Sequence, residues 1–191
     1  EFDQRAERAQ ARERHPAATV AELTRLVERR RRQFEVAATV SSLRSDAAQV
    51  TYHAADVGDP AAVREALAAA RARMGSVDLV IHGAGIDRSR SLMDKTEEEI
   101  EQILAVRLGG AQALLEAAGG ARLVAFTSVS GRFGNAGQID YAAANDGLAG
   151  LVVAHGGLAL DFSAWADIGM AAPLAGAAAS ALAYAGLDAA V

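Results

Sequence analysis

The 191-residue sequence contains no cysteine, only three prolines, and no apolar run that we expect to cross a membrane. Without cysteine the protein can form no disulfide and perform no thiolate chemistry. The charged N-terminus lacks the apolar core of a signal peptide. His53, His82 and His155 have no partners at the spacing of metal ligands, so we expect no metal site. Together these absences favour a cytoplasmic protein.

A strong charge of one sign is also missing, because the net charge is only -5. Nucleic acid and anionic membrane surfaces are bound by basic patches, so we expect neither as a partner. The one basic run, Arg29–Arg32, lies beside Glu28 and Glu35 and is interpreted as a solvated helix face. A phosphate-bearing cofactor is still possible, since backbone donors can bind it whatever the net charge.

The N-terminal quarter of the sequence has a helical composition. Residues 4–35 are rich in Ala, Arg, Glu and Gln and contain no Gly. Pro16 predicts a break in this helical stretch. Thr19, with Glu22 three residues later, forms a capping box that starts a second helix. We therefore predict a separate helical segment over residues 1–49.

From residue 50 the pattern changes to strands that alternate with helices. The expected strands are 50–54, 77–82, 123–127 and 158–162, and the expected helices are 59–73, 97–118 and 141–150. This alternation predicts βαβ units in a parallel sheet with helices on both faces, and a doubly wound, Rossmann-like α/β fold over residues 50–191. The near-continuous apolar run at 77–82 is typical of a strand buried on both faces.

Small or polar residues follow three of the expected strands. These segments are Asp56-Val57, His82–Gly85 and Thr127-Ser128. Ligands of open parallel sheets bind outside the carboxyl ends of the strands. Glycine there lets the backbone approach a bound molecule closely. Each segment alone is more typical of a turn, and their succession in one sheet is the stronger indication of a site.

A sharper pattern is formed by Ser128, Tyr141 and Asn145. Tyr141 and Asn145 are four residues apart on an expected helix and so share one face. A serine hydroxyl and a tyrosine phenol can both donate a hydrogen bond to one carbonyl oxygen, and the phenol can also supply a proton. A phenol is ordinarily deprotonated only near about pH 10, so this role requires a nearby cation. Without a family to compare, a purely structural role for the trio is favoured over catalysis.

Three longer motifs, HGAGI at 82–86, FTSVSGRFGNAGQIDYAAAND at 126–146 and ALDFSAWADIGMA at 159–171, resemble ketoreductase domains. These domains belong to polyketide and polyunsaturated-fatty-acid synthases and to the short-chain dehydrogenase/reductase superfamily. The segment GRFGN at 131–135 is most similar to the iterative bacterial type I enzymes, including the enediyne and polyunsaturated-fatty-acid groups. The resemblance covers about residues 50–170, and the preceding helical stretch is similar to an insertion in those groups.

The resemblance implies an NADPH-dependent reduction of a β-ketoacyl chain carried by an acyl carrier protein. Tyr141 would donate the proton, Ser128 would hold the carbonyl, and Asn145 would help to position the site and its water. The implied cofactor contacts are Asp56 and Val57 beside the adenine, and Gly83, Ala84 and Gly85 along the ribose and nicotinamide. Neighbouring synthase domains, and a homodimer formed through the parent synthase, are the implied partners.

The sequence departs from the ketoreductase pattern at the cation beside the tyrosine. In the family a lysine on the preceding long helix has this role, and the matching residue here is Arg107. Arginine keeps the positive charge but has a different reach and remains protonated at any working pH.

Other family features are absent or changed. No Gly-rich phosphate loop follows a strand, since Gly109-Gly110 and Gly119-Gly120 lie in or after a helix. We therefore expect this sequence to begin after the second strand of the fold and to be part of a longer polypeptide. Asp87-Arg88-Ser89 and Phe133 replace the two motifs that mark stereochemical class. Trp165 is interpreted as a packing residue, and the segment after Met170 as an abbreviated substrate lid.

Three hypotheses follow. The leading one is a β-ketoacyl reductase domain of a multidomain synthase. The first alternative is a catalytically silent ketoreductase fold that serves as a structural spacer. The second alternative is a stand-alone short-chain reductase that acts on a free ketone.

Overall fold

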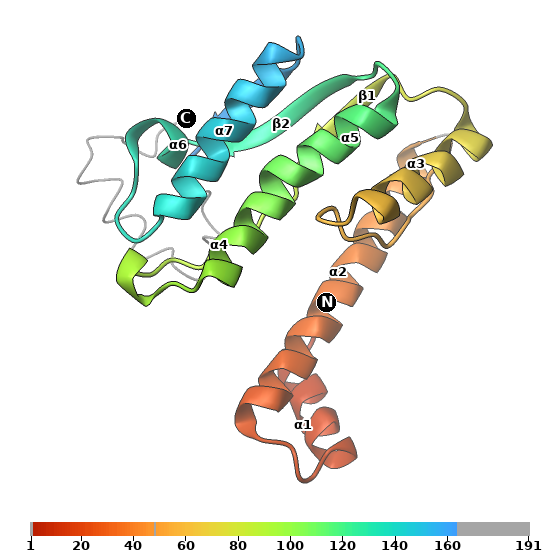
Figure 1. The fold of residues 1–191 in the computed structure, drawn as a ribbon. Helices are drawn as coiled ribbons and strands as arrows, with labels where there is room; N and C mark the ends of the chain where they lie inside the picture. Colours follow the sequence, from red (N-terminus) through yellow and green to blue (C-terminus); the bar gives the residue numbers. More distant parts are fainter. Residues whose placement is uncertain (1, 48, 164–191) are drawn as a thin grey trace. The chain divides into compact units, whose positions relative to one another are not determined.

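The computed structural model describes residues 2–47 and 49–163. The chain divides into two compact units, Glu1–His53 and Ala54–Val191, which we describe separately. Figure 1 shows their helices and strands in sequence colours. Among the helices that the structure describes, none is both long enough and apolar enough to cross a membrane.

The first unit is a pair of helices, α1 (Gln4–Arg14) and α2 (Val20–Asp46). The predicted capping box is confirmed: the Thr19 hydroxyl accepts from the Glu22 N–H, and the Glu22 carboxylate accepts from the Thr19 N–H. Leu23 and Val27 of α2 are the buried side chains of this unit. The break around Pro16 is also confirmed, and α2 continues well beyond residue 35.

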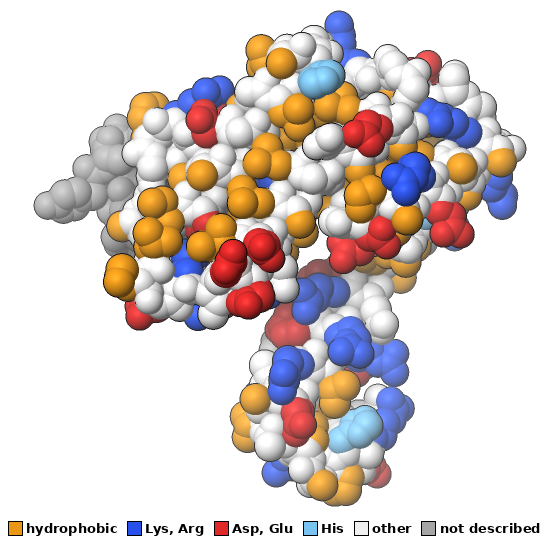
Figure 2. All heavy atoms as spheres, viewed as in Figure 1, with side chains coloured by type: hydrophobic (Ala, Val, Ile, Leu, Met, Phe, Trp, Pro, Cys, Tyr) orange, Lys and Arg blue, Asp and Glu red, His pale blue; other side chains and the backbone are white. Residues whose placement is uncertain are grey.

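The basic run on α2 is mostly exposed to solvent, as predicted. Arg31 pairs with Glu28 at 3.1 Å and with Glu35 at 2.7 Å, and these side chains are roughly half exposed. On the helical hairpin in Figure 2, Arg side chains are interspersed with acidic ones. Exposed pairs of this kind each stabilise a helix by less than about 1 kcal/mol.

The second unit is a parallel α/β structure, as predicted. Its elements are α3 (Pro60–Met74), β1 (Leu79–His82), the short 3-10 turn η1 (Leu92–Asp94), α4 (Glu97–Leu104), the π-helical turn η2 (Ala105–Gly109), α5 (Gly110–Ala118), β2 (Arg122–Ser128), α6 (Ser130–Phe133), α7 (Ile139–Ala154) and β3 (Leu158–Phe162). The strands are ordered β1-β2-β3, and Val124 of β2 lies opposite Ile81 of β1 and Leu158 of β3. Helices connect successive strands, which is the βαβ arrangement.

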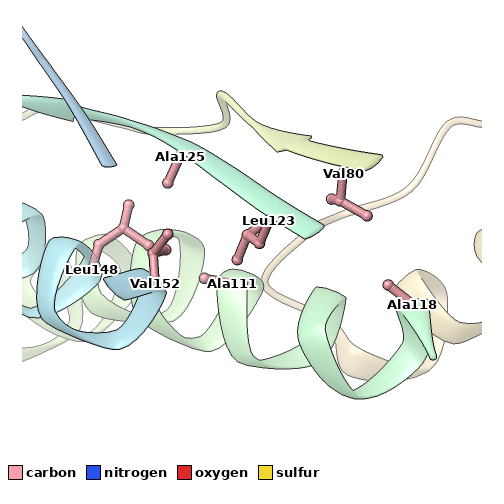
Figure 3. Packing of buried hydrophobic residues seen from close by; sticks show 7 residues of the cluster. All are labelled: Val80, Ala111, Ala118, Leu123, Ala125, Leu148 and Val152. Carbon is pink, nitrogen blue, oxygen red and sulfur yellow. The ribbon is translucent and has the colours of Figure 1, made fainter. Parts of the chain in front are cut away.

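The core of this unit lies between one face of the sheet and helices α5 and α7. Figure 3 shows strand side chains pointing toward these helices. The buried residues are small or branched: Val80, Ala111, Ala118, Leu123, Ala125, Leu148 and Val152. The alanines of α5 allow the helix to approach the sheet closely.

The opposite face of the sheet differs from the prediction of helices on both faces. Leu79 is 50% exposed, Ile81 58% and Phe126 39%. Among the described residues, helices therefore cover only one face, although the apolar run 77–82 is suited to burial on both.

The predicted strand at 50–54 is wrong. Residues 49–56 form neither helix nor strand. A β-strand is defined by backbone hydrogen bonds to a neighbouring strand. In the described residues the sheet consists of β1, β2 and β3, and none of them pairs with this segment. Its alternating sequence alone is not enough to make a strand.

Gly157, the residue before β3, provides a test of how closely the chain packs here against β2 and α7. A Cβ atom there would overlap the carbonyl oxygen of Leu123 and lie 2.7 Å from Cγ1 of Val152. We expect Gly157→Ala to lower the free energy of unfolding, measured by urea denaturation, by about 1–3 kcal/mol. The control is Gly150→Ala within α7, where a Cβ meets no heavy atom within 4 Å. It should raise stability by about 0.5–1 kcal/mol. Equal stabilities of the two variants would contradict the packing described here.

Candidate active site

The helix that follows β1 carries a buried arginine. A capping box of Thr96 and Glu99 starts α4, and the helix continues through η2 into α5. The predicted long helix over 97–118 is thus present, with a π-helical turn at its centre. Arg107 lies in this turn and is only 4% exposed. Turns of this kind often occur at functional positions.

The Arg107 guanidinium connects β2 to α7. Its Nη1 donates to the carbonyl of Phe126 at 3.0 Å, and its Nη2 donates to the Tyr141 hydroxyl at 3.0 Å. The guanidinium carbon also lies 4.7 Å from the centre of the Tyr141 ring, within the range of a cation–π contact. The structure therefore brings together two of the residues that the sequence singled out.

The electrostatics of Arg107 are set mainly by its burial. Removal from water lowers the pKa of the guanidinium, whereas Tyr141 and Asp87 act in the opposite direction. An arginine begins from so high a pKa that it remains a cation at neutral pH. The Tyr141 hydroxyl, whose residue is 8% exposed, thus lies beside a permanent positive charge.

Gly85 makes room for this guanidinium. A Cβ atom at position 85 would overlap the Nη2 atom of Arg107. The glycine is therefore needed by the protein itself, whether or not a ligand approaches it. At Gly83, by contrast, a Cβ would meet the Phe126 ring at an ordinary 3.5 Å. Gly83 and Ala84 are exposed just beyond the end of β1.

Asn145 lies one helical turn beyond Tyr141. Its Nδ2 donates to the Tyr141 carbonyl at 2.7 Å. Its Oδ1 is buried and accepts no hydrogen bond from any residue that the structure describes. Gly131 of α6 packs against it so closely that a Cβ there would lie 3.0 Å from the Asn145 Cβ. Asn145 is thus fixed in position, and its side-chain oxygen Oδ1 has no hydrogen-bond donor among the described residues.

Ser128 ends β2, two residues beyond the Phe126 carbonyl that Arg107 contacts. Its hydroxyl accepts from the Ser130 N–H at 3.1 Å, and the residue is 9% exposed. Across residues 2–47 and 49–163, no hydrogen bond links Ser128 to Tyr141. Ser128 and Tyr141 are therefore not held together by a direct hydrogen bond. Ser128 is positioned by β2 and Tyr141 by α7.

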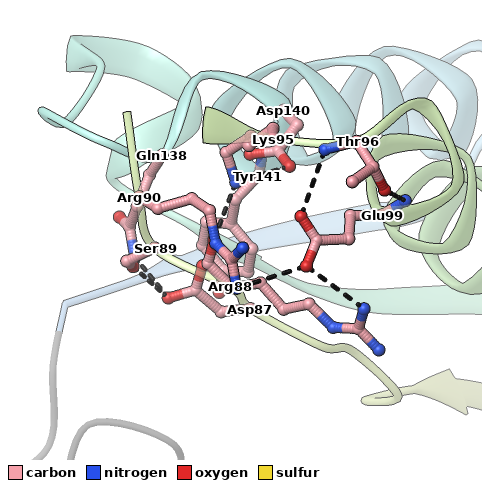
Figure 4. Close-up of polar contacts among 10 residues, drawn as sticks. All are labelled: Asp87, Arg88, Ser89, Arg90, Lys95, Thr96, Glu99, Gln138, Asp140 and Tyr141. Carbon is pink, nitrogen blue, oxygen red and sulfur yellow. Dashed lines mark hydrogen bonds and ion pairs between the residues drawn. The ribbon is translucent and has the colours of Figure 1, made fainter. Parts of the chain in front are cut away.

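The Gly-rich loop before α7 is tied to the loop after β1. Gln138 donates from Nε2 to the Asp87 carboxylate at 2.6 Å and to the Ser89 hydroxyl at 2.9 Å, contacts that are drawn in Figure 4. The Arg90 N–H donates to the Gly137 carbonyl at 2.9 Å. Hydrogen bonds thus join the two loops to each other next to Tyr141.

Asp56 and Val57 have local partners. Asp56 accepts from the Gly58 N–H at 2.9 Å. Val57 packs against the start of α5, where a Cβ at Gly110 would lie 2.8 Å from its Cγ2. In the part of the chain that the structure describes, no hydrogen bond or ion pair joins either residue to Arg107 or Tyr141.

His82 has a role in this site that the sequence did not predict. It is 2% exposed, and its Nε2 donates to the Arg107 carbonyl at 3.1 Å. Burial lowers the pKa of His82, partly opposed by the hydrogen bond to that carbonyl. A neutral imidazole therefore holds the backbone of η2. The only sequence signal was its place at the start of the HGAGI motif.

Two sequence predictions concern residues that lie outside the described ones, namely Trp165 and the lid after Met170. Within the described ranges, no group of three His, Asp or Glu side chains is arranged to hold a metal ion.

The fold resembles that of short-chain dehydrogenases. A solved short-chain dehydrogenase from Burkholderia cenocepacia, in complex with NADP, is 31% identical with a TM-score of 0.56. The similarity covers 60% of this chain and 49% of that one. The described residues thus form part of the Rossmann-like fold of this class.

The model of the KR domain family matches residues 14–167, so the chain belongs to that family. It is 31% identical over 167 residues to a polyunsaturated fatty acid synthase protein of Thraustochytrium sp., covering 83% of this chain and 6% of that protein. It is 37% identical over 102 residues to 3-oxoacyl-[acyl-carrier-protein] reductase FabG of Escherichia coli, covering 50% of this chain and 42% of that protein. The chain thus spans less than half the length of either relative.

The buried His82 predicts a pH-dependent stability. Its pKa is lowered in the folded state, so the unfolded state takes up the proton at a higher pH. Stability is then complete above about pH 6.5 and decreases as the pH falls toward the folded-state pKa. We expect the free energy of unfolding to decrease between about pH 7 and about pH 5.

His82→Gln is the matched variant for this prediction, because glutamine keeps an N–H donor for the Arg107 carbonyl but does not titrate. Its unfolding free energy should depend less on pH over the same interval. Parallel pH curves for the two proteins would show that His82 is not the titrating group.

Proposed function

We propose that the chain is the proton-donating part of an NADPH-dependent β-ketoacyl reductase. The observation that supports this most strongly is the 3.0 Å contact between the Arg107 guanidinium and the Tyr141 hydroxyl, which are both buried. A fixed cation stabilises the negative charge that develops on the phenol oxygen as its proton is transferred. The KR family membership agrees with this chemistry.

In the proposed reaction, the C=O π bond at the β-carbon breaks as a hydride forms a C–H bond with that carbon. The carbonyl oxygen takes the proton of the Tyr141 hydroxyl, so that a β-hydroxyl group forms. The phenolate left on Tyr141 is stabilised by Arg107 and is reprotonated from solvent. Ser128 donates a hydrogen bond to the reacting oxygen, and Asn145 positions the first turn of α7 and a water molecule.

NADPH, when bound, supplies the hydride. We propose that Gly83, Ala84 and Gly85 contact its nicotinamide and ribose. Asp56 and Val57 would contact its adenine. The fit is partial. The exposed residues Gly83 and Ala84 allow a ligand to approach the backbone closely. The space beside Gly85, in contrast, is filled by the Arg107 guanidinium. Among the described residues, no G-x-G-x-x-G turn follows a strand to hold the pyrophosphate.

The proposed substrate is a β-ketoacyl chain carried by an acyl carrier protein. FabG is by its name a 3-oxoacyl-[acyl-carrier-protein] reductase, and the Thraustochytrium relative is part of a fatty acid synthase. We propose neighbouring synthase domains and a dimer of the parent synthase as further partners. The division into a helical segment over 1–49 and a reductase part over 50–191 belongs to the same proposal.

Tyr141→Phe tests the proton donor. We expect kcat for reduction of an acetoacetyl thioester to fall by a factor of about 10²–10⁴, because no acid remains next to the carbonyl oxygen. The affinity for NADPH, measured by its fluorescence, should be nearly unchanged. Normal turnover by this variant would remove Tyr141 from the mechanism.

Replacements of Arg107 test the cation. Arg107→Lys keeps a positive charge beside Tyr141, and we expect it to keep or raise the rate. Arg107→Met removes the charge and should lower kcat by at least about tenfold. The measurement is steady-state reduction of the same thioester, with the thermal midpoint of each variant as a control for folding. If the methionine variant is as active as the lysine variant, the charge has no role.

A catalytically silent, structural role is the second candidate. It is favoured by the arginine at position 107, where the resemblance implies a lysine. A measurement of NADPH binding to the full-length protein distinguishes the reductase from the structural role. Binding with reduction of carrier-bound thioester supports the reductase, and no measurable binding supports the spacer.

A further inference from the structure

A buried ion pair lies beside the proposed proton donor. Lys95 Nζ and Asp140 Oδ2 are 2.8 Å apart, and their side chains are 0% and 1% exposed. Lys95 precedes the capping residue of α4, and Asp140 lies in the first turn of α7, directly before Tyr141. Figure 4 shows the pair next to Tyr141. Neither residue has a role in the mechanism above.

Both partners also hold backbone groups. Lys95 Nζ donates to the Arg88 carbonyl at 2.7 Å, and Asp140 Oδ1 accepts from the Tyr141 N–H at 2.8 Å. Gln138, at the start of α7, makes no side-chain capping bond. Asp140 therefore satisfies one of the unpaired N–H groups at the helix N-terminus, where a negative charge is also favourable.

The pair thus joins three segments that are distant in sequence: the loop after β1, the start of α4 and the first turn of α7. The same loop is held a second time, since Glu99 of α4 pairs with Arg90 at 3.2 Å and with Arg88 at 3.6 Å. The arginines thus hold the loop to α4, and the buried pair holds the loop and the start of α4 to the first turn of α7.

Burial removes both charges of the pair from water, so a pair of this kind is weak evidence for stability. Well-packed apolar residues often stabilise a fold equally well. Apolar contacts do not depend strongly on the orientation of the groups that meet. The ion pair and its two hydrogen bonds to the backbone, in contrast, fix the position of the Tyr141 main chain. The reacting hydroxyl has to meet Arg107 and the substrate within a narrow tolerance.

We propose that Lys95 and Asp140 are positioning residues, which hold Tyr141 so that its hydroxyl meets Arg107 and the reacting carbonyl. This inference rests on the proposed function for its effect on rate, although the placement of Tyr141 can be measured without any substrate.

The test is the double variant Lys95→Met/Asp140→Leu in the full-length protein, which removes both charges and leaves no unpaired one. We expect a thermal midpoint a few degrees below that of the wild type, because the Tyr141 N–H and the Arg88 carbonyl lose their partners, and a kcat lowered at least about tenfold. The KM for NADPH should change little, because the pair does not touch the proposed cofactor residues. The ¹³C signal of the Tyr141 ring, identified by its loss in Tyr141→Phe, should shift as the contact with Arg107 changes.

The matched control is Asp146→Asn. Asp146 is also on α7, but its ion pair with Arg132, at 3.5 Å, is largely exposed. This variant should keep the wild-type kcat and Tyr141 signal. If Lys95→Met/Asp140→Leu does not fold, Lys95→Met/Asp140→Asn is measured, since asparagine can still accept from the Tyr141 N–H. A smaller change of the same kind is expected for it.

Two outcomes separate this inference from the proposed function. If the wild type reduces no thioester but the Tyr141 signal shifts in the double variant, the positioning role stands and the reductase proposal fails. If the wild type is active and a folded double variant has normal kcat and an unchanged Tyr141 signal, the positioning role is overturned.

Discussion

The candidate site depends on the burial of one guanidinium group. A charged side chain is stable away from water only if its donors are bonded. Arg107 meets this condition only in part: Nη1 donates to the Phe126 carbonyl and Nη2 to the Tyr141 hydroxyl, whereas its buried Nε has no hydrogen-bond partner among the described residues. Each partner is on a different element, so the end of β2 and the first turn of α7 have to be correctly placed at the same time. The missing side chain of Gly85 follows from the same constraint, because a Cβ would occupy the place of the guanidinium.

Arg107 is itself placed by the backbone around it. The π-helical turn changes the phase of the long helix at this point, so that residues before and after it face differently from those of a regular α-helix. His82, at the end of β1, donates to the carbonyl of Arg107. Because burial keeps this histidine neutral, it adds no second positive charge near the guanidinium. The turn is therefore attached to the sheet without electrostatic conflict.

Local sequence signals predicted most of the elements but few of the contacts between them. The capping box at Thr19 and the apolar strands depend on neighbouring residues and could be predicted. The strand at 50–54 was predicted wrongly because pairing depends on a distant partner. In the site, the spacing of Tyr141 and Asn145 could be seen, whereas His82 with Arg107 and Lys95 with Asp140 are separated by 25 and 45 residues. No local pattern marks such pairs.

The choice of arginine over lysine has a physical consequence in this geometry. A lysine would present one compact charge at the end of a flexible stem, free to move toward whichever acceptor is stronger. The planar guanidinium contacts the Phe126 carbonyl with one nitrogen and the Tyr141 hydroxyl with another, so its orientation is fixed by the strand. The positive charge beside the phenol is then set by the backbone of β2. Arg107 therefore keeps its positive charge at every working pH. The rate of proton transfer then depends on how accurately α7 positions the Tyr141 hydroxyl.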